Sequence, residues 1–556
     1  MTLTLDLHMD GRVMGVLSKD EGRLRLRYDD AYRGDARALP LSLAMPLAGG
    51  TYADSVVQPW LWGLLPDNDA VLKRWARSFG VSQKDAFGLL TEVGEDCAGA
   101  VQFLRPGSAA APTAQVAWLT VSDVADRLRE LRTDPTTWQI RAGQGQFSLA
   151  GAQAKIALHR QGARWGVAAG PTPTTHILKP SVPGLDDHDV NEHLCLALAR
   201  ELGLAAALSH VLSFDDERAI VVTRYDRRAV AGTVRRVHQE DLCQALGRHP
   251  SERYQTDGGP SAREIARLLA RTGGRHAKDN VERFVDALVL HWLIGGTDAH
   301  AKNYSVLMHA SSVRLAPLYD VASALPYDDL DRHRLSLAMK VGHNYSLEWV
   351  GRSDWVQLAH EVHLDPDTLV LRAIHLARSL PSALEGVVSG PDITALDSAL
   401  PARLLDLLTQ RAERCSRALT TTVIGSATLT AASRMSAIGT VAPSRSWSAD
   451  EARTLLAALT SPARALLVAV CAEGGDAPAG RLKAVLATTS LQGRTSPVPR
   501  ALQRLQARGS IAADLQSPIE SYYADVPGRR PVAGIRLAPG ALKAFQTALE
   551  PPTAAL

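Results

Sequence analysis

The stretch Gly295-Gly-Thr-Asp-Ala-His-Ala-Lys-Asn303, followed by Leu315-Ala-Pro-Leu-Tyr-Asp320, decides how this chain is interpreted. Asp298 is followed by Asn303 five positions later, and Asp320 ends the second stretch. Phosphoryl transfer needs a carboxylate beside the attacking hydroxyl and oxygen ligands that hold Mg²⁺ on the phosphates. The spacing therefore predicts the catalytic loop of a kinase, with Asp298 as the base and Asn303 and Asp320 as the metal ligands.

The segments around this loop make the prediction specific, since an Asp-x-x-x-x-Asn spacing alone is common by chance. Residues 281–294 are apolar with helical periodicity, and residues 304–308 and 313–315 read as a hairpin that turns at 309–312. A helix end, a polar loop and a hairpin ending in Asp form the scaffold that such a site needs.

The composition predicts a soluble, cytoplasmic protein without membrane contact. The 556 residues are enough for three or more domains, and 46% hydrophobic with 21% charged residues is typical of globular domains. No apolar run reaches about 18 residues, and the N-terminus lacks the segments of a signal peptide. The five cysteines are scattered without a C-x-x-C pair, which indicates neither a zinc site nor a disulfide framework.

We expect five regions along the chain. Residues 1–105 predict a small α+β subdomain that opens with a turn at Asp10-Gly11 and with Leu3, Leu5 and Leu7 on one face of its first strand. Strand and helix signals alternate over residues 119–250, which predicts an ATP-binding N-lobe, and helices dominate residues 251–425, which predicts a C-lobe. Residues 426–447 are rich in Ser, Thr and Ala and predict a linker before residues 448–556.

Residues 147–159 predict a strand, a turn of small residues and a second strand. The turn contains Ala150, Gly151 and Ala152, whose small side chains would let the backbone approach phosphates. An ordinary hairpin turn is the alternative, because the turn matches neither a Walker A sequence nor the usual glycine loop of kinases.

A lysine and a glutamate follow in positions where a kinase needs them. Lys179 ends a strand predicted over residues 176–179, and Glu192 lies early in a capped helix predicted over residues 187–202. Lys179 could pair with phosphates, and Glu192 could orient it through a salt bridge. A surface lysine and a solvated glutamate are the alternative, but the place of Lys179 between the small-residue turn and the catalytic loop favours the phosphate role.

The remaining candidates have two open interpretations each. Tyr225 and Asp226 follow a buried strand predicted over residues 219–223, in the position of a hinge. Tyr225 could stack on adenine and Asp226 could bind the ribose hydroxyls. An equal alternative is that Tyr225 packs at the strand end and Asp226 forms a surface ion pair with Arg227. His300 could contact phosphate, although a structural histidine that braces the loop is better supported. No His-x-x-x-His spacing occurs around it, which argues against a zinc site.

The order of these segments is that of the two lobes of a protein kinase, and together they resemble the HipA family of bacterial serine/threonine kinases, toxins of type II toxin–antitoxin systems. The resemblance covers residues 1 to about 425. The matching segments are Gly94-Glu-Asp-Cys-Ala-Gly-Ala-Val-Gln102, Ser148-Leu-Ala-Gly-Ala-Gln-Ala-Lys155, Thr175-His-Ile-Leu-Lys179, Asn191-Glu192, Arg224-Tyr-Asp-Arg227, His238-Gln-Glu-Asp-Leu-Cys-Gln-Ala-Leu-Gly247, Thr297-Asp-Ala-His-Ala-Lys-Asn303 and Pro317-Leu-Tyr-Asp320.

The resemblance implies roles for individual positions. Asp298 is similar to the family's base, Asn303 and Asp320 to its Mg²⁺ ligands, and a further set to its ATP-binding residues: Ala150, Gly151, Ala152, Lys179, Tyr225, Asp226, Gln239 and His300. Ser148 matches a serine that family members autophosphorylate in trans, which expels the loop from the ATP site. A phosphoserine carries about −1.5 to −2 charges and would repel ATP phosphates. Thr223 stands where the family often has an acidic residue.

The resemblance also implies a cellular role. Such kinases phosphorylate a translation component, typically an aminoacyl-tRNA synthetase, and so favour dormancy and persistence. A helix-turn-helix antitoxin usually holds the kinase and represses its operon by binding operator DNA. Two other functions remain open: a catalytically silent kinase fold that acts as antitoxin or transcriptional regulator, and a kinase of small molecules.

The chain continues beyond the residues that resemble the family. The remaining residues predict a winged-helix-like domain. Its helices are expected at 449–472, 477–486 and 496–508, with a strand at 510–513. Two further strands at 521–526 and 531–537 flank a turn at 527–530, and a helix at 540–549 closes the domain. Arg500, Arg504 and Arg508 would share one helical face, and Arg529 and Arg530 would lie at the wing tip. We expect this domain to bind DNA or to inhibit the kinase. The alternative is a solvated basic face on a packing domain. Residues 446–556 carry 12 basic and 8 acidic residues, and their net charge of +4 is low for a DNA-binding domain.

Overall fold

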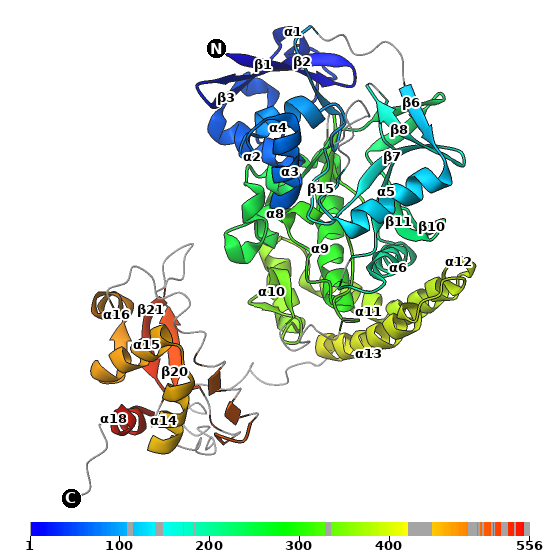
Figure 1. Cartoon of the computed structure of the whole chain (residues 1–556). Helices are drawn as coiled ribbons and strands as arrows, with labels where there is room; N and C mark the ends of the chain where they lie inside the picture. Colours follow the sequence, from blue (N-terminus) through cyan, green and yellow to red (C-terminus); the bar gives the residue numbers. More distant parts are fainter. Residues whose placement is uncertain are drawn as a thin grey trace, which may run out of the picture. The chain divides into compact units, whose positions relative to one another are not determined.

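The computed structural model divides the chain into two compact units, Met1–Thr422 and Val423–Leu556 (Figure 1). The described residues are 2–107, 115–138, 148–170, 172–182, 184–310, 312–327, 335–420, 447–486, 498, 501–502, 505–506, 508–512, 515, 517–523, 532–538 and 541–549. None of the helices in these ranges combines the length and the apolar character that a membrane span requires.

The first unit begins with an antiparallel sheet of five strands in the order β4-β3-β2-β1-β5. The strands are β1 (Leu3–Met9), β2 (Arg12–Asp20), β3 (Arg23–Tyr28), β4 (Thr51–Ala53) and β5 (Val101–Leu104). The predicted turn is confirmed: Asp10 and Gly11 both have positive φ, 49° and 77°, as a tight hairpin turn needs. The predicted inner face is wrong at one position, since Leu3 at the strand end is 48% exposed while Leu5 and Leu7 are buried.

Three helices cover one face of this sheet (Figure 1). They are α2 (Asp54–Leu64), α3 (Asp69–Phe79) and α4 (Ala86–Val93). Their buried side chains, such as Trp60 and Leu90, share one core with Leu5 and Leu7 of the sheet. The four-residue α1 (Asp30–Arg33) follows β3.

A second antiparallel sheet has the strand order β10-β11-β9-β7-β8-β6. Its strands are β6 (Gln115–Leu119), β7 (Ile156–Gln161), β8 (Arg164–Ala169), β9 (His176–Pro180), β10 (Ser209–Phe214) and β11 (Glu217–Thr223), and α5 (Val121–Thr133) and α6 (His188–Glu201) pack on it. Strands β9 and β11 confirm the predictions for residues 176–179 and 219–223.

Two local predictions in this region are wrong. In the described residues, no strand precedes the small-residue turn. Ser148 makes only an isolated bridge to Cys97, and the next strand starts at Ile156. Phe147 lies outside the described residues. The helix predicted over residues 187–202 is confirmed as α6, but the carboxylate of Asp187 does not cap it, because it accepts hydrogen bonds from Arg218 and Ser398 instead.

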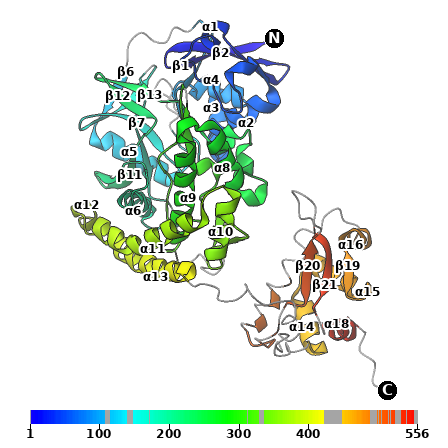
Figure 2. The same cartoon turned by 180° about the vertical axis from the view of Figure 1, so that it is seen from behind.

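The remainder of the first unit is mainly helical. Its helices are α7 (Leu242–Ala245), α8 (Ala262–Thr272), α9 (Ala277–Ile294), α10 (Arg352–Glu361), α11 (Pro366–Val388), α12 (Pro391–Thr394) and α13 (Leu400–Thr420). Helix α9 is buried along most of its length, and α11 packs along α13 at the lower edge of the first unit in the view from behind (Figure 2). The short strands are β12 (Arg227–Val230), β13 (Thr233–Arg236), β14 (Gln239–Asp241), β15 (Ser305–His309), β16 (Ser312–Leu315), β17 (Ser336–Val341) and β18 (Asn344–Ser346).

The scaffold of the predicted catalytic loop is confirmed. Helix α9 ends at Gly295, whose left-handed φ of 69° suits a glycine after a helix, and its N–H donates to the carbonyl oxygen of His291. Strands β15 and β16 then pair from Val306↔Leu315 to His309↔Ser312.

The second unit has its own core and a three-stranded sheet in the order β19-β21-β20. Its elements are α14 (Ala449–Ala458), α15 (Ser461–Ala472), β19 (Asp476–Pro478), α16 (Ala479–Val485), β20 (Ile519–Tyr523), β21 (Val532–Leu537) and α18 (Ala541–Leu549). The hairpin of β20 and β21 and the final helix confirm the prediction. The single helix predicted over 449–472 is two, because Pro462 starts a new helix, and Ser510 and Ile511 lie in a bend rather than a strand.

Four of the five arginines of the predicted DNA-binding face are not among the described residues. Arg500, Arg504, Arg529 and Arg530 lie outside the described residues, as do residues 421–446, which hold the predicted linker except Trp447; that residue packs in the core of the second unit. Arg508 is described and lies in a turn, because the left-handed Gly509 follows it with a φ of 69°. It therefore does not extend the helical face that the spacing predicted.

One buried carboxyl group fastens the N-terminal sheet region to the rest of the first unit. Glu240 on β14 is 1% exposed and accepts hydrogen bonds from the backbone N–H of Leu43 at 2.8 Å and from Nε1 of Trp60 at 3.0 Å. Burial raises the pKa of Glu240 to about 8.

We predict that Glu240→Gln flattens the pH dependence of stability. Between the ordinary pKa of glutamate and about 8, the unfolded chain carries an ionised Glu240 and the folded chain a protonated one. The wild type should therefore lose stability relative to the variant as pH rises through this window, by up to about 1.4 kcal/mol per pH unit, and the difference should level off above the folded pKa. Urea unfolding at pH 5.5, 7 and 8.5 measures it.

The exposed Glu385 on α11 provides the control, since Glu385→Gln changes the same group in solvent. A constant difference between wild type and Glu240→Gln across the three pH values would contradict the assignment.

Candidate active site

A cavity of about 650 Å³ lies where β9, α6 and the segment of residues 148–155 meet the loop after α9. Every residue predicted to bind nucleotide or metal or to act as the base lines it: Ala150, Gly151, Ala152, Lys179, Tyr225, Asp226, Gln239, Asp298, His300, Asn303 and Asp320. These positions are far apart in the sequence, and the fold brings them to one place.

A buried lysine joins three segments at this cavity. Nζ of Lys179 on β9 lies 2.8 and 3.0 Å from the two carboxylate oxygens of Glu192 on α6 and 2.7 Å from Oδ1 of Asp320. Burial alone would lower the pKa of Lys179, but the Asp320 and Glu192 carboxylates raise it above its usual value. Both partners keep the lysine charged inside the protein, where a lone cation would be costly.

Asp320 has a strained backbone and a stabilised charge. Its φ of 57° is left-handed, which non-glycine residues seldom adopt, so the surrounding packing must hold it. Burial would raise the pKa of Asp320, but Lys179 and Lys155 hold it well below its usual range.

The small-residue turn brings a second lysine to the cavity. Nζ of Lys155 donates to the carbonyl oxygen of Ala150 at 2.7 Å and faces the ring of Trp138. Burial and the neighbouring Lys179 lower the pKa of Lys155 to about 8. Gly151 has a φ of 107°, a backbone conformation that favours glycine, and a Cβ there would lie 2.5 Å from Nζ of Lys155 and displace the end of that side chain.

The proposed base is held by two contacts. Tyr254 donates its hydroxyl to Oδ1 of Asp298, whose side chain is 65% exposed and faces the cavity. Asn303 donates from Nδ2 to the backbone carbonyl oxygen of Asp298 at 2.7 Å. That bond fixes the amide and leaves the side-chain oxygen of Asn303 with no hydrogen bond to the described residues.

His300 and Lys302 brace the same loop. Nε2 of His300 lies 3.9 Å from Oδ1 of Asp298, its ring packs edge-on against Tyr254, and burial lowers its pKa. Lys302 is buried and donates to Oδ2 of Asp241 at 2.9 Å and to the carbonyl oxygen of Gly63 at 3.2 Å. The loop is thereby tied to both β14 and α2.

The predicted hinge residues have different surroundings. Tyr225 donates its hydroxyl to Oε1 of Gln239, and its ring centroid lies 5.7 Å from that of Tyr319. These three side chains form one wall of the cavity. An aromatic surface is therefore present where an adenine ring was expected.

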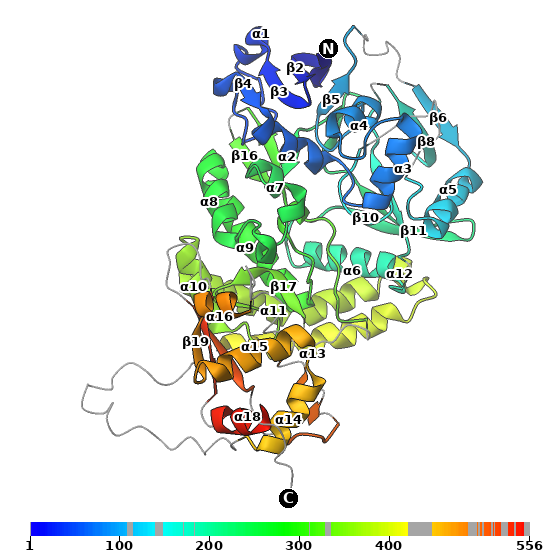
Figure 3. The same ribbon diagram turned by 60° about the vertical axis from the view of Figure 1, so that its left-hand side comes forward.

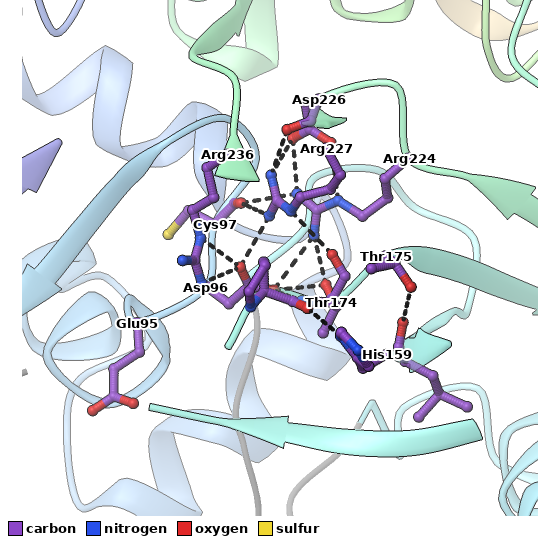
Figure 4. Close-up of polar contacts among 12 residues, drawn as sticks. Glu95, Asp96, Cys97, His159, Thr174, Thr175, Arg224, Asp226, Arg227 and Arg236 are labelled. Atoms are coloured by element: carbon purple, nitrogen blue, oxygen red, sulfur yellow. Dashed lines mark hydrogen bonds and ion pairs between the residues drawn. The ribbon is translucent and has the colours of Figure 1, made fainter. Parts of the chain in front are cut away.

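Asp226 belongs to a buried ion cluster (Figure 4). Its Oδ2 accepts hydrogen bonds from the N–H of Gly99 at 2.8 Å and from Arg224 and Arg227 at 2.9 Å each, and its Oδ1 accepts from Arg224 at 3.0 Å. These bonds from the protein compete with the ribose contact expected for Asp226, which stays a prediction. The ion pair with Arg227 that was its alternative is present, but it is buried rather than on the surface.

The other acid of the cluster is Asp96, from the loop after α4. It accepts from Arg227 and Arg236 at 2.9 Å each and from the hydroxyl of Thr174 at 2.6 Å. Burial would raise the pKa of Asp96, but the three arginines Arg227, Arg224 and Arg236 hold it well below its usual range. The cluster fastens the N-terminal region to the segment that follows β11.

Ser148 does not line the cavity and is fully buried. Its hydroxyl donates to the carbonyl oxygen of Leu64 at 2.8 Å, and its N–H donates to the backbone carbonyl oxygen of Asp96 at 2.9 Å. A phosphate could not be added to this hydroxyl without moving the segment.

The sequence alone did not suggest Tyr254, Lys155, Lys302 or Asp96 as parts of the site. Tyr254 lies between two short 3₁₀ turns with no motif around it. Lys155, Lys302 and Asp96 lie inside segments that were noted, and the signal that could have found them is a charged residue among small or apolar neighbours.

The residues fit ATP and Mg²⁺. Lys155 and Lys179 supply cations for phosphates, and the cavity is of the size that holds small ligands. No group of three or more His, Cys, Asp or Glu that could hold a metal occurs in the described part of the chain. Asn303 and Asp320 offer two oxygen donors. This number suits Mg²⁺, since this ion commonly takes one or two protein ligands together with phosphate oxygens.

Comparison with known proteins gives consistent matches. Residues 5–104 match the model of the HipA N-terminal domain, and residues 147–384 match that of the HipA-like C-terminal domain. The putative kinase Y4mE of Sinorhizobium fredii is 33% identical over 416 residues, covering 74% of this chain and 97% of its own. The serine/threonine-protein kinase toxin HipA of Shewanella oneidensis is 29% identical over 432 residues, 75% of this chain and 96% of its own.

A solved structure agrees with the sequence matches. The complex of HipA, HipB and operator DNA from Shewanella oneidensis MR-1 contains a chain that superposes with a TM-score of 0.65 at 27% identity, covering 75% of this chain and 98% of that one. Both family models end before the second unit, Val423–Leu556. Through its first unit, the chain belongs to the HipA family of serine/threonine kinase toxins.

Proposed function

We propose that this chain is an ATP- and Mg²⁺-dependent protein serine/threonine kinase with a two-lobe, protein-kinase-like fold. The observation that carries the proposal is the buried Lys179, held by Glu192 and Asp320 at the cavity that Asp298 and Asn303 also line. A lysine fixed by a helix glutamate, a loop aspartate and asparagine, and a second aspartate is the set that phosphoryl transfer requires.

Each side chain has a distinct role in this mechanism. Lys179 and Lys155 bind the phosphates, and Glu192 keeps Lys179 extended. Asp298 accepts the proton of the attacking serine or threonine hydroxyl, while Tyr254 and the Asn303 amide hold it in place. Asn303 and Asp320 would hold Mg²⁺, which when bound neutralises phosphate charge. Lys302 holds the loop to Asp241 and performs no chemistry.

The substrate and partners follow from the family. A translation component such as an aminoacyl-tRNA synthetase is the proposed protein substrate. A helix-turn-helix antitoxin and operator DNA are proposed partners, supported by the related structure that contains HipA, HipB and operator DNA.

We predict that Asp298→Ala lowers ATP-dependent phosphorylation by about 10²- to 10⁴-fold, the usual contribution of a general base. Lys179→Met should lose activity as well, because Glu192 and Asp320 then face each other without the cation. Incubation of the full chain with γ-labelled ATP and Mg²⁺, followed by mapping of phosphorylated sites, measures both.

Asp257→Asn is the matched control, since Asp257 is exposed in a neighbouring turn and should keep wild-type activity. Equal labelling of wild type and Asp298→Ala would contradict a live kinase and favour a silent kinase fold that acts as a regulator. If neither protein is labelled, the assay is repeated on residues 1–430: label there would show that the second unit restrains the kinase, and none would favour the silent fold. Turnover on sugars or aminoglycosides alone would indicate a small-molecule kinase instead.

Ser148 is the proposed site of autophosphorylation. Because its hydroxyl is buried against the Leu64 carbonyl oxygen, modification requires the segment to leave the core. We predict that Ser148→Ala removes the label at this position and leaves activity on added protein substrate intact, whereas Ser148→Asp abolishes that activity. Mass spectrometry and a substrate assay read the two effects separately.

Ser251→Asp, at an exposed serine, controls for the added charge. Label that persists unchanged in Ser148→Ala would show that the acceptor is another residue.

The second unit is proposed to be a winged-helix-like domain that binds DNA or restrains the kinase. The order α15, β19, α16, then the hairpin of β20 and β21, supports it, together with helical backbone at residues 501–502 and 505–506. Deletion after residue 430 should reduce operator binding or increase toxicity on expression in a bacterial host. No change in either would end this proposal.

A further inference from the structure

Helix α8 exposes a row of arginines that the kinase site does not use. Arg263, Arg267 and Arg271 are spaced four residues apart, so they share one face of the helix over about 12 Å. All three are exposed, and the opposite face of α8 is buried through Ile265 and Leu269. Figure 3 shows α8 at the edge of the first unit.

The positive charge continues past the end of α8. Arg275 lies four residues after Arg271, in a 3₁₀ turn that contacts β16, and β16 exposes Arg314. Burial lowers the pKa of His276, and the charges of Arg314 and Arg275 lower it further. These two arginines therefore lie within electrostatic range of the same side chain. Asp279 is the acid that faces His276 there.

These arginines are not neutralised by the protein. Within the described residues, Arg263, Arg267, Arg271 and Arg314 form no ion pair, and Arg275 bonds only to His276. Two of the nearby acids pair with other cations, Glu264 with Arg248 and Glu282 with Lys278 and Arg372. Asp279 is the acid that acts on this group, through His276. A row of unpaired guanidinium groups repels itself, which a polyanion would relieve.

The surroundings of the row indicate what kind of polyanion fits. No large exposed hydrophobic side chain occurs among the described residues between Val230 and Trp349. Interfaces with folded proteins have an apolar and aromatic centre, whereas those with nucleic acid are polar and strongly positive. Unpaired bases would need exposed aromatic rings for stacking, and α8 exposes none between its arginines.

We propose that this ridge, defined as Arg263, Arg267, Arg271, Arg275 and Arg314, docks the phosphate backbone of double-stranded DNA. Arginine suits this task because its planar fork binds phosphate oxygens in pairs. The ridge belongs to the first unit and uses none of the cavity residues. It is therefore independent of kinase activity and of any DNA binding by the second unit.

The test is fluorescence anisotropy of the full chain with a labelled 25-base-pair DNA duplex over a salt series. Arg263→Gln, Arg267→Gln and Arg271→Gln are combined, since glutamine keeps helix propensity close to that of arginine. Loss of three phosphate contacts should lower the slope of log affinity against log salt by about 2–3 and weaken binding about tenfold or more near 0.1 M salt. Circular dichroism and kinase activity should stay at wild-type level.

Three other exposed arginines without ion partners in the described residues, Arg23, Arg25 and Arg27 on β3, provide the matched control. Their replacement by glutamine removes the same charge, so an effect confined to the α8 variant supports the ridge. Absence of duplex binding by wild type, equal losses in both variants, an unchanged slope in the α8 variant, or tighter ridge-dependent binding of single-stranded DNA or RNA would overturn it.

Discussion

The ammonium group of Lys179, enclosed by the carboxylates of Glu192 and Asp320, is the interaction on which the site depends. It connects β9, α6 and the segment after β16, so a shift of any one of them leaves a charge unpaired inside the protein. Breaking such a buried pair costs about 3–5 kcal/mol, which is a large part of the stability of a domain. Geometry and electrostatics therefore support each other here.

The sequence predicted the parts of the site that have local patterns. The apolar helix before Asp298, the hairpin before Asp320 and the strand that carries Lys179 each have a periodicity that backbone geometry imposes. Their meeting at one cavity could be expected from segment order and from the family resemblance. The strand expected before Ile156 failed, because Ser148 pairs with Cys97 from a distant loop rather than with its neighbours in sequence.

The features that the sequence did not predict arise from long-range contacts between isolated residues. Asp226 was expected to face ribose, but Arg224 and Arg227 occupy its oxygens in a cluster completed by Asp96, 130 positions earlier. Tyr254 reaches Asp298 across 44 positions, and Glu240 reaches Trp60 across 180. No periodicity or spacing encodes such pairs, since each depends on how whole elements pack. The row on α8 is the opposite case: its spacing is plain, but only the fold reveals that it is exposed and unpaired.

The burial of Ser148 has a consequence for timing. While its hydroxyl bonds to Leu64, a second copy of the chain cannot reach it, and only molecules whose segment has opened can react. Opening is a first-order event within one molecule, whereas the encounter of two copies is second order. With Ser148 as the acceptor, inactivation would quicken with protein concentration and then level off at the opening rate. The segment would thus set a lower limit on how long each kinase molecule stays active, however abundant the protein becomes.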